Sequence, residues 1–143
     1  MAVKFDWLIK DRVIYSRTIG VGRKDDLVFM RETAIAMIAA GTPPVHYIAD
    51  ATYQNGHDLG FRDMREVFLN RIEPSPKRGW TVGVLPSPML RLLASLAGQF
   101  GRFPQREFTA IEDALAFLVQ QDDTLPDHEA LMIAYRLLDE HYY

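Results

Sequence analysis

The sequence predicts an α/β domain with a mostly parallel central sheet flanked by helices. Three observations carry this prediction. Short apolar segments alternate with amphipathic segments along most of the chain, the first two strand-like segments are joined by a tight polar turn, and 143 residues with 48% hydrophobic and 24% charged content suit one core. Strands that alternate with helices need crossover connections, which give parallel pairing, and the first hairpin adds an antiparallel edge.

The first three elements follow from hydrophobic period. Apolar residues alternate in residues 4–10 and again in 12–20, which predicts two strands, and the polar "KDR" between them predicts a hairpin turn. Residues 25–41 carry apolar side chains at helical spacing, and a glycine followed by a proline ends that helix at Gly41.

The middle of the chain repeats the alternation. Residues 44–50 form a short apolar run bounded by prolines and a turn, which predicts a buried strand. Residues 61–72 predict a helix that buries one face, with Phe61 as its first buried residue. The run "WTVGVL" at 80–85 is apolar on both faces, which is typical of an internal strand between two helical layers.

The last third adds a strand and three helices. Residues 87–101 predict a helix, and the proline-bearing segment 103–108 predicts an edge strand because proline cannot donate to a sheet. Residues 109–121 predict a helix that opens with a capping box at Thr109. A final helix is expected over 126–143, so the predicted order is β-β-α-β-α-β-α-β-α plus a C-terminal helix.

Composition excludes several classes of function. The absence of cysteine excludes disulfides and thiol nucleophiles and fits a reducing compartment. A net charge of -3 argues against a nucleic-acid-binding surface. The N-terminus meets charge within a few residues, and no uncharged apolar run approaches the ~18 residues of a membrane span. We expect a soluble cytoplasmic protein with no cofactor and no transmembrane segment.

Three stretches make the order of elements recognisable: "AAGTPPVHYIADA", "RGWTVGVLPSPMLRLLASLAGQFG" and "REFTAIEDALAFLVQ". Over about residues 5 to 121 the chain resembles the STAS domain, the fold of bacterial anti-sigma-factor antagonists. It also resembles a bacterial group of short STAS-like proteins, also described as STAS-SEC14-like, that share their fold with the lipid-binding CRAL-TRIO module. The resemblance implies a STAS-like domain at 1–121. Residues 122–143 are then a helical extension that packs on the domain or on a partner.

The loop "DATYQNGHDLG" at 50–60 is where the resemblance becomes specific. In STAS antagonists a strand-end aspartate is followed about eight residues later by a second one and then by a serine that a kinase phosphorylates. Asp50 and Asp58 have that spacing, but Leu59 stands in place of the serine and the Thr52 hydroxyl is not at the matching position. We therefore do not expect the phosphorylation switch. Asp50 is expected to accept loop amides and Asp58 to cap the next helix.

Catalysis and metal binding find little support in the histidines. His57 beside Asp58 is a candidate base, but adjacent side chains seldom face each other and no obvious nucleophile accompanies them. An enzyme would have to use Asp50, His57 or Asp58. His46 lies in a predicted buried strand, where we expect a backbone or hydroxyl partner, and no local spacing predicts a metal site.

The predicted helix at 87–101 is the other place to look for binding. Free amides from Ser87 to Leu90, with Arg91, are candidates to hold an anion at the end of a parallel strand; in the simpler interpretation Ser87 is the N-cap and Arg91 is solvated. Leu92 lies outside the main apolar face and either covers a neighbour, lines an apolar pocket or meets another subunit.

The sequence thus predicts a non-catalytic, STAS-like regulatory module that binds a protein partner, with a homodimer as one form. The alternative is a small-molecule or lipid-binding protein that uses an apolar cleft near the 88–101 helix. Seven residues are candidates for contact with a partner or ligand: Asp50, Thr52, His57, Asp58, Ser87, Arg91 and Leu92. An enclosed cavity would favour the ligand binder, and an exposed apolar helix face would favour the interaction module.

Overall fold

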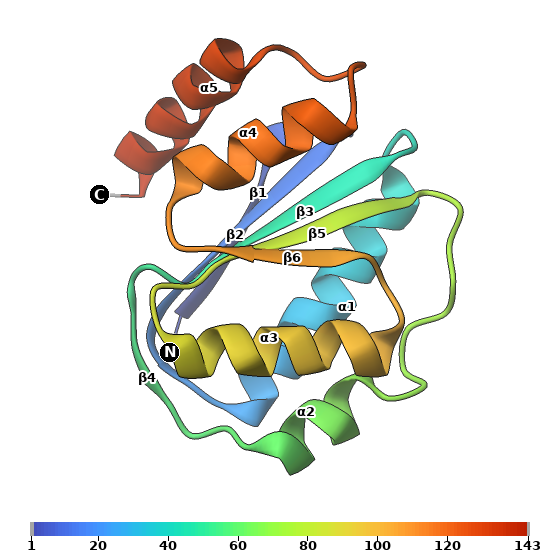
Figure 1. Cartoon of the computed structure of the whole chain (residues 1–143), viewed down its shortest axis with the longest axis vertical. Helices are drawn as coiled ribbons and strands as arrows, with labels where there is room; N and C mark the ends of the chain where they lie inside the picture. The colour runs from blue at the N-terminus through green and yellow to red at the C-terminus, as the bar shows by residue number, and fades with distance from the viewer. Residues whose placement is uncertain (1, 143) are drawn as a thin grey trace.

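The computed structural model, which describes residues 2–142, places a six-stranded sheet between two layers of helices (Figure 1). The strands are β1 (Ala2–Ile9), β2 (Val13–Gly22), β3 (Val45–Asp50), β4 (Gln54–His57), β5 (Arg78–Val84) and β6 (Gln105–Phe108). The helices are α1 (Lys24–Ala40), α2 (Phe61–Phe68), α3 (Pro88–Gly101), α4 (Ile111–Gln121) and α5 (His128–His141). The predicted final residue of the last helix, Tyr143, lies outside the described residues.

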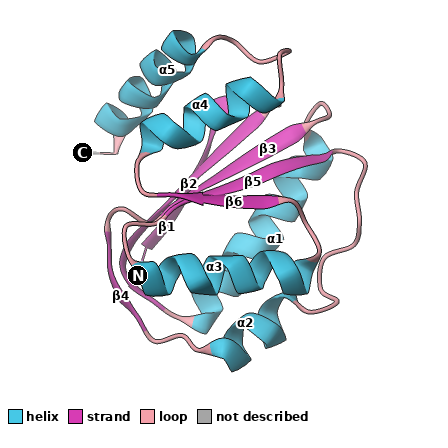
Figure 2. Cartoon of the chain, in the orientation of Figure 1, coloured by secondary structure: helices cyan, strands magenta, loops and turns pink. Residues whose placement is uncertain are grey.

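The strand order is β1-β2-β3-β5-β6, with β4 paired to the end of β2. β1 is antiparallel to β2, and the other pairings are parallel. Helices α1, α2 and α3 cover one face of the sheet, and α4 and α5 cover the other (Figure 2). These findings confirm the predicted α/β fold, with its mostly parallel sheet, its antiparallel first hairpin and its edge strand at 103–108.

Alternation along the strands explains the two layers. In β2, Val13 and Tyr15 pack toward α4 and α5, whereas Ile14 packs toward α1. In β3, Ile48 packs toward α4 and α5, and Tyr47 packs toward α1. Because both faces are covered, these strands read as nearly continuous apolar runs in the sequence.

A bulge interrupts the pairing of β3 with β5. Val45 pairs with Arg78, but Tyr47 pairs with Thr81, so two residues of β5 lie opposite His46. The extra residue reverses which face the start of β5 presents, and Arg78 consequently lies on the same side of the sheet as Thr81.

His46 fills the space that the bulge opens. Its Nδ1 accepts a hydrogen bond from the Trp80 amide (2.9 Å), so its Nε2 carries the proton and donates it to Asp122 Oδ2 (2.8 Å). Gly79 is required at the bulge, since a Cβ there would lie 2.5 Å from His46 Nδ1. His46 thus has the backbone partner that the sequence led us to expect, and it adds a carboxylate partner.

Asp122 extends this cluster beyond the sheet. Arg12, in the turn between β1 and β2, donates from one Nη to Asp122 Oδ2 and to Thr124 Oγ1, both at 2.8 Å. Burial alone raises the pKa of Asp122, but the hydrogen bonds from His46 and Thr124 prevail and lower it to about 2. The cluster therefore fastens the end of α4 to the hairpin and to β3.

Several local predictions were wrong. Residues 54–57 form a short strand, β4, that has no apolar alternation to reveal it. The helix predicted at 61–72 ends at Phe68, because Leu69 is extended and Asn70 takes the left-handed conformation (φ 57°), and Phe61 is 58% exposed instead of buried. Thr109 does not cap α4, which begins after Ala110 without a side-chain cap.

The C-terminal helix packs on the α4 side of the sheet. Leu131 of α5 is fully buried in the core beneath α4, and the Tyr142 hydroxyl donates to Asp6 Oδ2 of β1 (2.8 Å). Within residues 2–142, no helix combines the length and the apolar character that crossing a bilayer requires.

We predict that Asp122→Asn lowers the free energy of unfolding by about 1–2 kcal/mol at neutral pH. The folded pKa of Asp122 lies below its ordinary value, so its contribution is complete above about pH 4 and disappears as the pH falls toward 2. Urea denaturation at pH 7 and near pH 2.5 should show that the difference in free energy of unfolding between wild type and variant is smaller at the acid pH. Asp123→Asn, at the exposed neighbouring position, is the matched control; an equal effect there would contradict the assignment.

Candidate functional site

The predicted site residues lie near the carboxyl ends of β2, β3 and β5, where the 50–60 loop and the start of α3 begin. Ligands tend to bind at this edge in α/β sheets.

Asp50 ends β3 and is 1% exposed. One oxygen accepts a hydrogen bond from the Tyr15 hydroxyl, and the other accepts from the Thr52 amide (2.9 Å) and hydroxyl (2.5 Å). Burial, together with the nearby Asp50 charge, raises the pKa of Tyr15 well above its ordinary value and keeps it a donor. Both carboxylate oxygens of Asp50 therefore already have internal hydrogen-bond partners.

Arg17 carries the same network into α5. Its Nε donates to the Tyr15 hydroxyl (3.0 Å), and an Nη donates to Asp139 Oδ1 (2.7 Å). The guanidinium also lies over the rings of Tyr53 (4.3 Å) and Tyr142 (4.9 Å). Sequence analysis missed this network, although the polar "SRT" inside an otherwise apolar strand was a signal for it.

The remaining loop residues do not form a catalytic group. Thr52 is exposed and contacts Asp50, whereas no hydrogen bond within the described residues joins Asp50, His57 and Asp58. The His57 Nδ1 atom is buried and has no hydrogen-bond partner among residues 2–142. Nor do three or more metal-binding side chains gather anywhere in that range.

The predicted N-cap role of Asp58 was wrong. α2 begins after Gly60, whose amide donates to Asp63 Oδ2 (2.9 Å), so the acidic group at the helix start comes from inside the helix. Asp58 is instead exposed and uses its amide to pair with the Gly22 carbonyl (2.8 Å), in the register that β4 makes with β2. The unpredicted strand β4 thus takes up Asp58, and the N-cap lies two residues later, at Gly60.

At the start of α3, the polar groups are already paired. Ser87 is the N-cap and accepts from the Leu90 amide (3.4 Å), with Pro88 at the first helical position. Arg91 donates to the Leu85 carbonyl (2.9 Å). The N-cap role of Ser87 is confirmed, whereas Arg91 is half-buried and bonded to the backbone instead of solvated.

Leu92 lies on an apolar stripe along the outer side of α3. Met89 (51% exposed), Leu92 (55% exposed), Leu96 and Phe100 recur at helical spacing, and the Phe100 ring meets Phe61 of α2 edge-on at 5.3 Å. We call these five residues the α3 stripe. Such a stripe is the kind of surface that protein partners cover.

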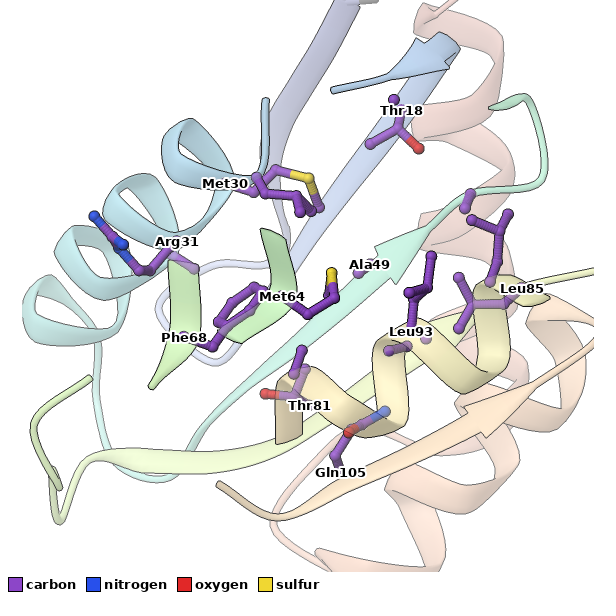
Figure 3. Close-up of a pocket in the computed structure, with 18 of the residues that line it drawn as sticks. Thr18, Met30, Arg31, Ala49, Met64, Phe68, Thr81, Leu85, Leu93 and Gln105 are labelled. Atoms are coloured by element: carbon purple, nitrogen blue, oxygen red, sulfur yellow. The ribbon is translucent and has the colours of Figure 1, made fainter. Parts of the chain in front are cut away.

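A cavity of about 140 Å³ lies between the sheet and helices α1, α2 and α3 (Figure 3). Its wall is largely apolar and includes Met30, Met64, Phe68, Leu85 and Leu93. The helix at 88–101 contributes to it, as the alternative function requires. Leu92 does not line the cavity, so the predicted cleft and the exposed stripe are separate features on opposite sides of α3.

We predict that Asp50→Ala lowers the free energy of unfolding by about 2–4 kcal/mol, because it leaves the buried Tyr15 hydroxyl without an acceptor. Asp58→Ala, in the same loop but exposed, should change it by less than about 0.5 kcal/mol. Thermal and urea denaturation of the two variants measure the difference. Equal effects of both substitutions would show that Asp50 is not the buried anchor of the loop.

Comparison with known proteins identifies the fold. No protein-family model matches the chain, and no curated protein matches its sequence. An uncharacterised DUF3478-family protein with a SpoIIAA-like fold from Shewanella loihica PV-4 is 18% identical with a TM-score of 0.53, over 82% of this chain and 92% of that one. The anti-sigma factor antagonist SpoIIAA, in its unphosphorylated form, is 18% identical with a TM-score of 0.50, over 83% and 97%. The chain therefore has the SpoIIAA-like, or STAS-like, fold.

Proposed function

We propose that this chain is a non-catalytic regulatory module of the bacterial cytoplasm that binds a protein partner through the α3 stripe. The observation that carries the proposal is the set of apolar side chains on α3 and α2 that face solvent. The fold adds support, because SpoIIAA, which shares it, is an anti-sigma factor antagonist and so acts on another protein.

The stripe has the composition of a binding surface. Phe61, Met89 and Leu92 are each more than half exposed, and leaving such large apolar groups in water is unfavourable. The core does not depend on these three side chains, because the inner face of α3 packs through Leu93 and Ala97. A partner that covers the stripe would gain burial without any rearrangement of the domain.

Charge around the stripe favours a different protein over a second copy. From Pro88 to Arg102 the chain has two arginines and no acidic residue, whereas α2 is balanced, with Arg62 and Arg65 beside Asp63 and Glu66. A two-fold contact between copies would bring the arginines of α3 together. We therefore propose a partner with an apolar surface and an acidic rim, and homodimerisation is the competing outcome of the test.

The proposed regulation does not use the phosphorylated serine of STAS antagonists. Leu59 occupies the sequence position where the resemblance places that serine, and its side chain packs with the α2–α3 core and lines the cavity. A side chain at this position faces the interior, so this chain's control is proposed to come from partner binding itself.

Small-molecule binding is the second candidate function. The cavity beneath α1, α2 and α3 supports it, because its apolar wall is of the kind that holds small ligands. The two candidates are compatible, since the stripe and the cavity lie on different sides of α3.

Site-specific photo-crosslinking tests partner binding. A photoreactive phenylalanine analogue at position 92, in the full chain expressed in its own host, should give a discrete crosslinked species with a second protein. The same probe at Leu137, which is 64% exposed on α5, is the matched control and should not give that species. Native mass spectrometry of the purified complex then identifies the partner's mass.

With the probe kept at position 92, Met89→Glu should abolish the crosslinked species while changing the free energy of unfolding by less than about 0.5 kcal/mol, because Met89 is also an exposed residue of the stripe. Leu137→Glu should leave it intact. A crosslinked species with the mass of two copies of this chain would replace the proposed partner by a homodimer. Equal crosslinking from positions 92 and 137, or none from either, would overturn the proposal.

A further inference from the structure

We propose that the cavity binds a small organic monocarboxylate, with its carboxylate on Arg78 and Thr81 and its apolar body among the methionines and leucines of the opposite wall. The inference rests on the second candidate function and names its ligand class. It depends on two polar atoms that the described residues leave unpaired inside an otherwise apolar space.

The first polar group is the Arg78 guanidinium. The bulge in β5 places Arg78 on the cavity side of the sheet, and its Nε is buried without a hydrogen-bond partner among residues 2–142. No carboxylate pairs with it in that range, and its Cζ lies 5.2 Å from the centroid of the Phe103 ring. Burial lowers the pKa of Arg78, which is the expected sign for a cation that lacks a counter-ion.

The second polar group is the Thr81 hydroxyl. Its Oγ1 is buried and also has no partner among the described residues. Thr81 follows Arg78 by three residues, yet the bulge puts both on the wall of the same cavity, where Figure 3 shows the Thr81 side chain. Buried polar atoms in folded proteins almost always have partners, so these two atoms on one cavity wall are suited to a ligand that accepts a hydrogen bond from each.

A carboxylate satisfies both polar atoms. It accepts hydrogen bonds from an Arg Nε–H and from a hydroxyl, and its single negative charge matches Arg78. Of the other two arginines that line the cavity, Arg31 pairs with Glu32 and Arg23 is exposed. A phosphate would bring more charge than Arg78 alone neutralises, and a neutral alcohol would not neutralise Arg78 at all.

The remaining space sets the size of the ligand. The cavity volume of about 140 Å³ is close to that of an engineered apolar cavity of about 150 Å³ that takes up benzene, so the apolar body has about six carbon atoms. Met30 and Met64 from α1 and α2 face this space in Figure 3, and their flexible thioethers can adjust to a chain or a ring.

Calorimetric titration with sodium hexanoate and with 1-hexanol, which share one chain length, tests the inference. Hexanoate should bind wild type at least tenfold more tightly than hexanol. Arg78→Met should weaken hexanoate by about tenfold to a hundredfold, the effect of losing a hydrogen bond to a charged group, and should leave hexanol binding unchanged. Methionine keeps the length needed to pack on Phe103, so the variant should fold, which circular dichroism checks.

Two further variants sharpen the result. Thr81→Val should weaken hexanoate by a few fold, and it keeps the test open if Arg78→Met does not fold. Arg106→Met is the matched control: Arg106 lies on the neighbouring strand over the Phe117 ring (5.3 Å), on the α4 side, and its loss should not change hexanoate binding.

The outcomes separate the ligand class from the function. Equal affinity for hexanoate and hexanol in wild type, or equal loss in the Arg78 and Arg106 variants, would overturn the carboxylate assignment and leave an apolar-ligand cavity. No binding of either probe would overturn both the assignment and the second candidate function. Neither result would bear on partner binding at the α3 stripe.

Discussion

The bulge between β3 and β5 is the constraint on which the rest of the structure depends. One extra residue in β5 leaves the Trp80 amide without its regular strand partner, and the His46 ring supplies an acceptor. The ring fits only because position 79 is glycine, and its other nitrogen reaches Asp122 beyond α4. The same extra residue turns Arg78 to the opposite face of the sheet. The bulge therefore has two effects: it lets His46 link the sheet to the end of α4, and it places the Arg78 side chain on the cavity wall.

The two sides of the sheet are built differently as a result. On the α4 and α5 side, apolar packing is continuous and the polar atoms of Tyr15, Arg17 and Asp50 are joined to one another and to α5. On the α1, α2 and α3 side, the core is divided into smaller clusters around a cavity with unpaired polar atoms at Arg78 and Thr81. A closed side that holds the domain together and an open side that can accept a ligand or a partner suit a binding module.

Hydrophobic period was enough to predict the architecture, because both faces of β2, β3 and β5 are covered and the helices between them are amphipathic. It failed where a polar or tertiary contact decides the outcome. β4 forms because its residues pair with the last residues of β2, and the polar sequence of β4 gives no sign of this pairing. The partners of Asp50 come from segments 35 residues earlier and two residues later, and only the second is visible in the local sequence. The position of Arg78 depends on a bulge that the residue pattern does not predict.

The central claim is that the bulge orients Arg78 toward a cavity that binds a ligand. A high-resolution crystal structure of the full chain purified from its own host tests this claim most directly. We predict electron density for a small molecule between the sheet and α1, α2 and α3, with an oxygen atom within hydrogen-bonding distance of both Arg78 Nε and Thr81 Oγ1. A regular β3–β5 pairing with Arg78 turned out to solvent, or a cavity closed by its own side chains, would contradict the account.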